Sequence, residues 1–200
     1  MSVVVAIKQG NKIYMGADSQ VTRGGTRLSL SNPNNYKIWK VKGVENCLMA
    51  SVGDLRDACV IRIMNGLVRE IDALKGEVDF EYVVGRIVPL IKEELIDYGY
   101  IKKDGVFEGF ESSYLFAFED KLFYINRDAS VIEIDDCIAI GSGSNEAIGS
   151  LITSSKEEDS EQRIVKAIKS SAAHDIYVDY PIILVNTETT EFKVLTEDKE

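Results

Sequence analysis

The chain has 200 residues, of which 23 are Lys or Arg and 33 are Asp or Glu, so its formal net charge is −10. This acidic balance argues against a nucleic-acid binder or a protein held on an anionic membrane, and no apolar run reaches the ~18 residues of a membrane-spanning helix. Three scattered cysteines and one histidine disfavour a zinc site and a Ser–His triad, and they indicate reduced thiols in a cytoplasmic protein. We therefore expect no metal, no nucleic acid and no membrane partner. No repeat or linker divides the chain, so residues 1–200 are predicted to form one domain.

Short apolar runs bounded by turn residues predict four strands in the first quarter of the chain. A polar, glycine-containing stretch from Thr22 to Asn35 separates the second strand from the third. These strands are expected at residues 3–7, 12–17, 36–41 and 47–52.

Two helices are predicted next, at residues 54–75 and 79–98. In the first, apolar residues recur every four positions and Gly76 follows the end. The second contains Pro89, which should remove a hydrogen bond or kink the helix. The four-residue repeat comprises Leu55, Cys59, Ile63, Leu67 and Ile71.

The second half of the chain repeats the order of strands, helices and strands. Asp159 and Gln162 form a capping box at the start of the later of two helices. Hairpin-linked strands and paired helices favour an α+β fold of two stacked antiparallel sheets covered by helices. The predicted strands lie around 114–118 and at 121–126, 131–134, 137–140, 182–186 and 192–195, and the helices at about 144–153 and 159–173.

Ser2 is the first candidate for chemistry. It follows Met1, and its side chain is small enough for the methionine to be removed, which would place a hydroxyl and a free amine on one residue. An α-amine titrates near 7.7–8.0 and so suits the general base of a nucleophilic hydroxyl. Many cytosolic proteins also begin Met-Ser without any such role.

Four further residues mark the ends of predicted strands. Each is a candidate for the same site as Ser2, and each also has a purely structural interpretation. Asp18 could be a turn former, Lys37 a solvated charge on a strand, Gly53 a turn before a helix and Ser142 a helix N-cap. The GSG segment around Ser142 does not match a dinucleotide-binding fingerprint, because Glu146 occupies the position of its third glycine.

The ordered set of segments resembles the proteasome β-subunit and its bacterial relative HslV, within the N-terminal nucleophile (Ntn) hydrolases. The resemblance runs from Ser2 to about Val185 and implies a four-layer αββα sandwich. The segments that carry it are GADSQVT (16–22), NYKIWKV (35–41), ASVGDLRD (50–57) and GSG (141–143).

The resemblance also implies a role for each residue. Ser2 would be the nucleophile with its own amine as base, Lys37 would stabilise alkoxide character, and Asp18 would keep Lys37 protonated. The Gly53 N–H would be an oxyanion donor, and Ser142 would hydrogen-bond the terminal amine.

One segment departs from the family pattern. In proteasome β-subunits an Asp and a Ser support the nucleophile, whereas here Asp175 keeps the carboxylate and Val178 replaces the serine, as in HslV-like sequences. Methionine removal would be the only maturation step, because no propeptide precedes Ser2.

The sequence thus predicts a threonine/serine-type endopeptidase of peptides or unfolded proteins, without cofactor. By resemblance it would form a homo-oligomeric ring fed by an AAA+ unfoldase, with exposed apolar surface on the first long helix as the contact. The alternatives are a small-molecule Ntn amidase, a catalytically silent ring subunit if Met1 is retained, and an unrelated α+β binding protein.

Overall fold

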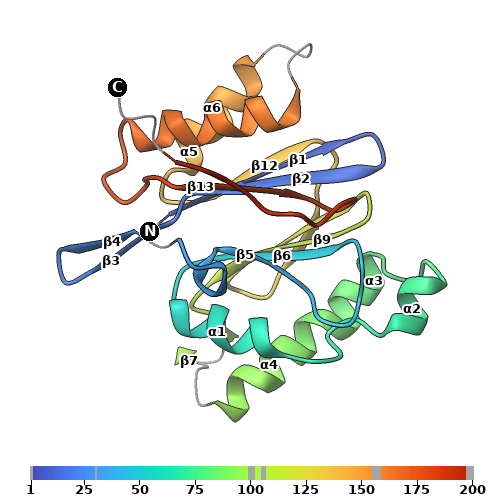
Figure 1. Ribbon diagram of the computed structural model, residues 1–200. Coiled ribbons are helices and arrows are strands. Elements are labelled where there is room, and N and C mark those ends of the chain that lie inside the picture. The colour runs from blue at the N-terminus through green and yellow to red at the C-terminus, as the bar shows by residue number, and fades with distance from the viewer. Residues whose placement is uncertain (1, 30, 99–101, 105–106, 155–158, 197–200) are drawn as a thin grey trace.

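The computed structural model describes residues 2–29, 31–98, 102–104, 107–154 and 159–196. Two five-stranded antiparallel sheets are stacked face to face, and a layer of helices covers the outer face of each (Figure 1). This order is the αββα sandwich that the sequence predicts. Within the described residues, no helix is both long and apolar enough to cross a membrane.

Sheet I has the strand order β12-β1-β2-β13-β14. Its central strands are apolar on both faces because helices pack on one side and the other sheet packs on the opposite side. Val3 and Val5 of β1 face the helices, whereas Val4 faces the second sheet. The strands are β1 (Val3–Gln9), β2 (Lys12–Ala17), β12 (Cys137–Gly141), β13 (Ile182–Asn186) and β14 (Lys193–Leu195).

Sheet II has the strand order β11-β10-β9-β6-β5. On β9, Leu115 and Ala117 point toward sheet I, while Tyr114 and Phe116 point toward the outer helices. The strands are β5 (Ile38–Lys40), β6 (Cys47–Val52), β9 (Ser113–Phe118), β10 (Lys121–Ile125) and β11 (Val131–Glu133).

The helices divide between the two outer layers (Figure 1). Those covering sheet I are α5 (Ser144–Thr153) and α6 (Ser160–Ala172). Those covering sheet II are α1 (Leu55–Ile63), α2 (Glu70–Leu74), α3 (Phe80–Tyr82) and α4 (Val88–Asp97). A π-helical turn, Val83–Ile87, joins α3 to α4.

The predicted helix 54–75 is wrong as a single element. The helix α1 ends at Ile63, Met64 adopts an extended ψ of 142°, and Gly66 has a φ of +72°. The glycine conformation is one that L-residues rarely adopt, so the chain turns here and restarts as α2. In the predicted helix 79–98, Pro89 lies in the first turn of α4, and the π-helical turn directly before it interrupts the regular α-helical hydrogen bonding.

Two hairpins lie outside the predicted strands. Strand β3 (Gln20–Arg23) runs into the stretch from Thr22 to Asn35, which also contains β4 (Thr26–Ser29) and a 3₁₀ turn, Pro33–Asn35. Gly24 and Gly25 both have positive φ, as a two-residue hairpin turn requires. This hairpin projects from the edge of the sandwich beside the N-terminus (Figure 1). The second hairpin pairs β7 (Lys102–Asp104) with β8 (Phe107–Gly109).

Candidate active site

Ser2 lies at the start of β1, between β12 and β2, and is 6% exposed. Its backbone nitrogen donates a hydrogen bond to Ser142 Oγ at 3.0 Å, and its carbonyl oxygen accepts one from the Gly143 N–H at 3.3 Å. Gly141, with φ +104°, allows this approach, because a Cβ there would overlap the Ser2 carbonyl oxygen. The glycine-serine-glycine segment therefore wraps around Ser2. The N-cap of α5 is Gly143, so Ser142 is not the helix cap.

Asp18 and Lys37 form a buried ion pair next to this chain end. Lys37 Nζ lies 2.7 Å from Asp18 Oδ2 and 2.8 Å from the Gln20 carbonyl oxygen. Asp18 also accepts hydrogen bonds from the Val3 and Gln20 N–H groups at 2.9 and 3.1 Å. With Asp18 at 0% and Lys37 at 7% exposure, Lys37 is not a solvated strand charge. Asp18 also forms the strand-end turn, because its Oδ2 accepts hydrogen bonds from both the Gln20 N–H and Lys37 Nζ.

Burial shapes the acid–base properties of this pair. Desolvation lowers the pKa of Lys37 from its ordinary value of 10.5, and the opposing attraction of Asp18 and Asp175 limits the shift. Desolvation likewise raises the pKa of Asp18 against the stabilising effect of Lys37 and the two backbone donors. The result is an ammonium group held close to Ser2 that gives up its proton more readily than a surface lysine.

Gly53 forms the turn between β6 and α1. Its φ is +136°, and the next residue, Asp54, caps α1 by accepting the Arg56 N–H at 2.8 Å. A Cβ on Gly53 would lie 2.6 Å from Ser112 Cα and 2.7 Å from the Glu111 carbonyl oxygen. Only glycine fits here, so the turn is tightly packed rather than a simple loop.

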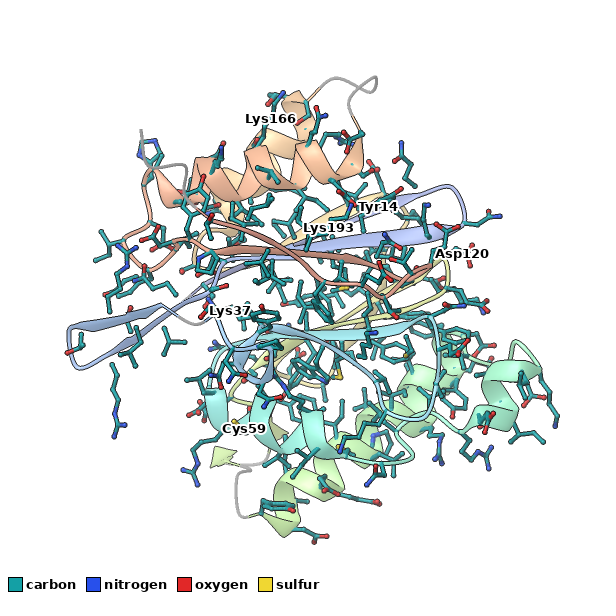
Figure 2. The ribbon with its side chains drawn as sticks, in the orientation of Figure 1. Tyr14, Lys37, Cys59, Asp120, Lys166 and Lys193 are labelled. Carbon is teal, nitrogen blue, oxygen red and sulfur yellow. The ribbon has the colours of Figure 1, made fainter. Side chains whose placement is uncertain are left out.

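A cavity of about 210 Å³ brings these elements together. Ser2, Lys37 and Gly53 all line it, with walls from the β3–β4 hairpin and α1. Figure 2 shows Lys37 between the two sheets near the N-terminal edge, and Cys59 below it on α1. Cys59 is exposed, unlike the buried Cys47. The other lining residues are Val21, Leu28, Asn34, Asn35, Tyr36, Ser51, Val52, Asp54, Leu55, Ala58 and Arg62.

A proteasome subunit family model matches residues 2–184. The chain belongs to the proteasome subunit family. Its members include Ntn hydrolases of the proteasome and HslV type, and they form oligomeric rings.

Solved structures with the same fold come from this family. BPH from Thiobacillus denitrificans is 20% identical with a TM-score of 0.71, and the match covers 98% of this chain and 100% of that one. The same protein in complex with epoxomicin gives 19% identity, a TM-score of 0.69 and the same coverage. Eukaryotic HslV from Trypanosoma brucei is 18% identical with a TM-score of 0.63, covering 92% of this chain and 98% of that one. A search of curated protein sequences finds no match.

In this family member, Asp175 lies in the turn after α6. Its Oδ1 accepts the Tyr177 N–H at 2.9 Å, and its other oxygen is buried without a hydrogen-bond partner among the described residues. Its negative charge raises the pKa of Lys37 and so opposes the effect of burial on that group. Val178 is buried and packs into the apolar core between sheet I and its helices.

Two serines at this site give no signal in the sequence. Ser171, on α6, donates a hydrogen bond to the Gly143 carbonyl oxygen at 2.6 Å and so holds the segment around Ser2 from the helix side. Ser112, directly before β9, packs against Gly53 at the end of the neighbouring strand β6. Each is one of two adjacent serines outside any recognised motif, and only the tertiary structure reveals its position. The described residues contain no cluster of side chains that could hold a metal ion.

Proposed function

We propose that this proteasome-family chain is an N-terminal-serine peptidase that cleaves peptide bonds through an acyl-enzyme on Ser2. The observation that carries the proposal is the setting of Ser2, whose nitrogen is hydrogen-bonded to Ser142 Oγ beside the buried Lys37–Asp18 pair. Ser2 and Lys37 line a cavity that can admit a substrate side chain. Removal of Met1 would turn the Ser2 nitrogen into a base on the nucleophilic residue itself.

The reaction would proceed in two balanced steps. Ser2 Oγ attacks the peptide carbonyl carbon, its proton passes to the α-amine, and the Gly53 N–H donates a hydrogen bond to the developing oxyanion. Collapse breaks the C–N bond, the ammonium returns its proton to the leaving amine, and an ester on Ser2 remains. Water, deprotonated by the same amine, then attacks the ester carbonyl carbon. The bond from Ser2 Oγ to that carbon breaks, the ammonium returns its proton to Ser2 Oγ, and the acid is released.

The surrounding residues have supporting roles in this proposal. Lys37 lowers the energy of negative charge on Ser2 Oγ, and Asp18 orients Lys37. Ser142 Oγ accepts a hydrogen bond from the α-amine of Ser2 and helps to relay protons to and from that amine. Asp175 adds a negative charge that favours the protonated form of Lys37. Together these groups replace the histidine of a serine protease triad.

We further propose a homo-oligomeric ring that degrades peptides or unfolded proteins supplied by an AAA+ unfoldase in the cytoplasm. Ring formation in the family supports this view, as do large apolar side chains exposed on the outer helices.

The intact mass of protein purified without an N-terminal tag tests the nucleophile. We expect the mass to lack one methionine, and epoxomicin to add to the peptide that begins at Ser2. The Ser2→Ala variant should lose the same methionine but take up no epoxomicin, which separates processing from reactivity. Retention of Met1 would overturn the peptidase proposal in favour of a silent ring subunit. Turnover of small amides without cleavage of peptides would favour an amidase.

A further inference from the structure

Ser112 is buried at 0% exposure, one residue before β9, and its hydroxyl group makes two hydrogen bonds to one neighbouring residue. It accepts the Asp54 N–H at 3.0 Å and donates to the Asp54 carbonyl oxygen at 3.2 Å. Asp54 directly follows Gly53 and caps α1. A single side chain therefore binds both backbone groups of the residue that leaves the Gly53 turn.

The packing restricts the turn from a second direction. The hypothetical Cβ of Gly53 would lie 2.6 Å from Ser112 Cα and 2.7 Å from Ser112 Oγ, so the two residues are in close contact. Across the sheet, Val52 pairs with Ser113 in the β6–β9 register. The peptide that carries the Gly53 N–H thus lies between strand β6 of sheet II and the Gly53–Asp54 peptide, which the Ser112 hydroxyl holds. Its orientation depends on both ends, because loss of the Ser112 contact would free φ of Gly53.

The first turn of α1 is tied to β9 in the same region. Tyr114 Oη donates a hydrogen bond to Asp57 Oδ2 at 3.3 Å, and both side chains are buried. Tyr114 is the partner of Ser51 across the sheet, and Ser51 lines the cavity. The first turn of α1 is therefore linked to sheet II by a side-chain hydrogen bond.

We propose that Ser112 is a positioning residue that holds Gly53 in its left-handed conformation and so aims the Gly53 N–H at the substrate oxyanion. The inference rests on the proposed function for its catalytic consequence, but its structural part does not. An oxyanion donor is useful only when its direction is set before the reaction, since reorientation during the reaction would cost part of the stabilisation. Ser112 supplies that preorganisation without touching the substrate.

The role makes a specific kinetic prediction for Ser112→Ala. Loss of one oxyanion donor costs about 10²–10³ in kcat, and a displaced donor should cost somewhat less, about 10- to 100-fold. KM should change by less than about threefold, because ground-state contacts of the peptide are unaffected. A peptide aldehyde, which forms a tetrahedral adduct, should bind correspondingly more weakly, whereas the matching peptide amide should bind equally well.

A matched control removes a buried hydroxyl elsewhere. Thr187 is 1% exposed, accepts the Ile13 N–H at 3.0 Å and donates to the Glu119 carbonyl oxygen at 2.6 Å. Glu119 precedes Asp120, which Figure 2 shows at the opposite edge of the sandwich from Lys37. Thr187→Ala should lower the thermal stability as much as Ser112→Ala while leaving kcat and aldehyde binding unchanged. Ser112→Cys, which keeps the volume and a weak donor, serves if Ser112→Ala does not fold.

Hydrogen exchange of the Asp54 amide is measured on the same proteins, and it is independent of catalysis. We expect this amide to exchange faster in Ser112→Ala than in the parent and in Thr187→Ala. Unchanged exchange would overturn the proposal whatever the activity, and so would faster exchange with an unchanged kcat and unchanged aldehyde binding.

If epoxomicin fails to label Ser2 in the parent, the peptidase proposal is overturned. Faster exchange would then still support the role of Ser112 in the turn, and unchanged exchange would overturn it.

Discussion

At the scale of single residues, burial controls the charge state of Lys37. Its pKa is lowered from the ordinary 10.5 by desolvation. The proposed reaction needs Lys37 charged and the α-amine of Ser2 neutral. The value of kcat/KM should therefore rise as pH increases through about 7.7–8.0. At higher pH it should decline again as Lys37 loses its proton, and this decline should begin at a lower pH than the titration of an ordinary lysine.

A pH–rate profile of peptide hydrolysis checks this expectation. In Lys37→Arg, the guanidinium keeps its charge at all accessible pH values. Any residual activity of that variant should therefore lack the alkaline decline. An alkaline limb that is the same in parent and variant would show that Lys37 does not set it.

Asp57 leads to a second prediction at this scale, for stability. Desolvation and the nearby charges of Asp54 and Glu111 raise the pKa of Asp57, and contacts with Ser112 and Tyr114 oppose the shift. A carboxyl group with a raised folded-state pKa contributes stability fully below its unfolded pKa and loses that contribution as pH rises through the folded value. Relative to the parent, Asp57→Asn should therefore gain in Tm between about pH 4 and neutral pH. Thermal melts across this range measure the difference, and a constant difference would contradict the prediction.

The sequence identifies the candidate residues that have a fixed spacing, but not those that support them. Ser2, Asp18, Lys37 and Ser142 occur in ordered motifs, and the structure brings all four together. Ser112 and Ser171 could not be found in this way, because their roles depend on which strands and helices become neighbours. Their contacts join positions 58 and 28 residues apart.

At the scale of elements, an aspartate side chain caps the start of three helices, α1, α3 and α6. Asp159 caps α6, its side chain accepting the Gln162 N–H at 3.0 Å. Asp159→Ala should reduce the free energy of unfolding by about 0.5–2 kcal/mol. Peptidase activity should be unaffected, since α6 meets the site only through its last turns. Urea denaturation gives the value, and Asp159→Asn, which retains an acceptor, is the control. Equal stability of the parent and the alanine variant would show that this cap contributes nothing.

The predictability of the elements depends on the patterns that define them. The strands β2, β6 and β13 agree with the predicted bounds, because an apolar run ends at turn residues on both sides. The helical repeat was misleading in α1, where Leu55 and Ile63 are exposed and the buried face contains Asp57 and Val60. A four-residue repeat identifies one face of a helix but not which face is buried, nor that Gly66 ends it.

At the scale of the whole molecule, apolar side chains on the helix layer over sheet II suggest how copies associate. Ile71 and Leu74 of α2 are 57% and 81% exposed. Side chains of this kind are often buried by a partner surface. The double variant Ile71→Glu/Leu74→Glu should sediment as a smaller species than the parent. Lys166→Glu, on the opposite helix layer (Figure 2), is the control. Unchanged sedimentation of the double variant would exclude α2 from the contact.

If Met1 is removed as proposed, the position of Ser2 also bears on when that removal takes place. Ser2 begins an interior strand, is buried, and has its nitrogen hydrogen-bonded to Ser142. An aminopeptidase binds an extended chain end, whereas the Ser2 nitrogen in the folded chain is hydrogen-bonded within the sandwich. Under the proposed function we therefore expect trimming to precede folding, while the chain leaves the ribosome. Protein that folds untrimmed would stay untrimmed, and only unfolding it in the presence of the aminopeptidase would release the active form.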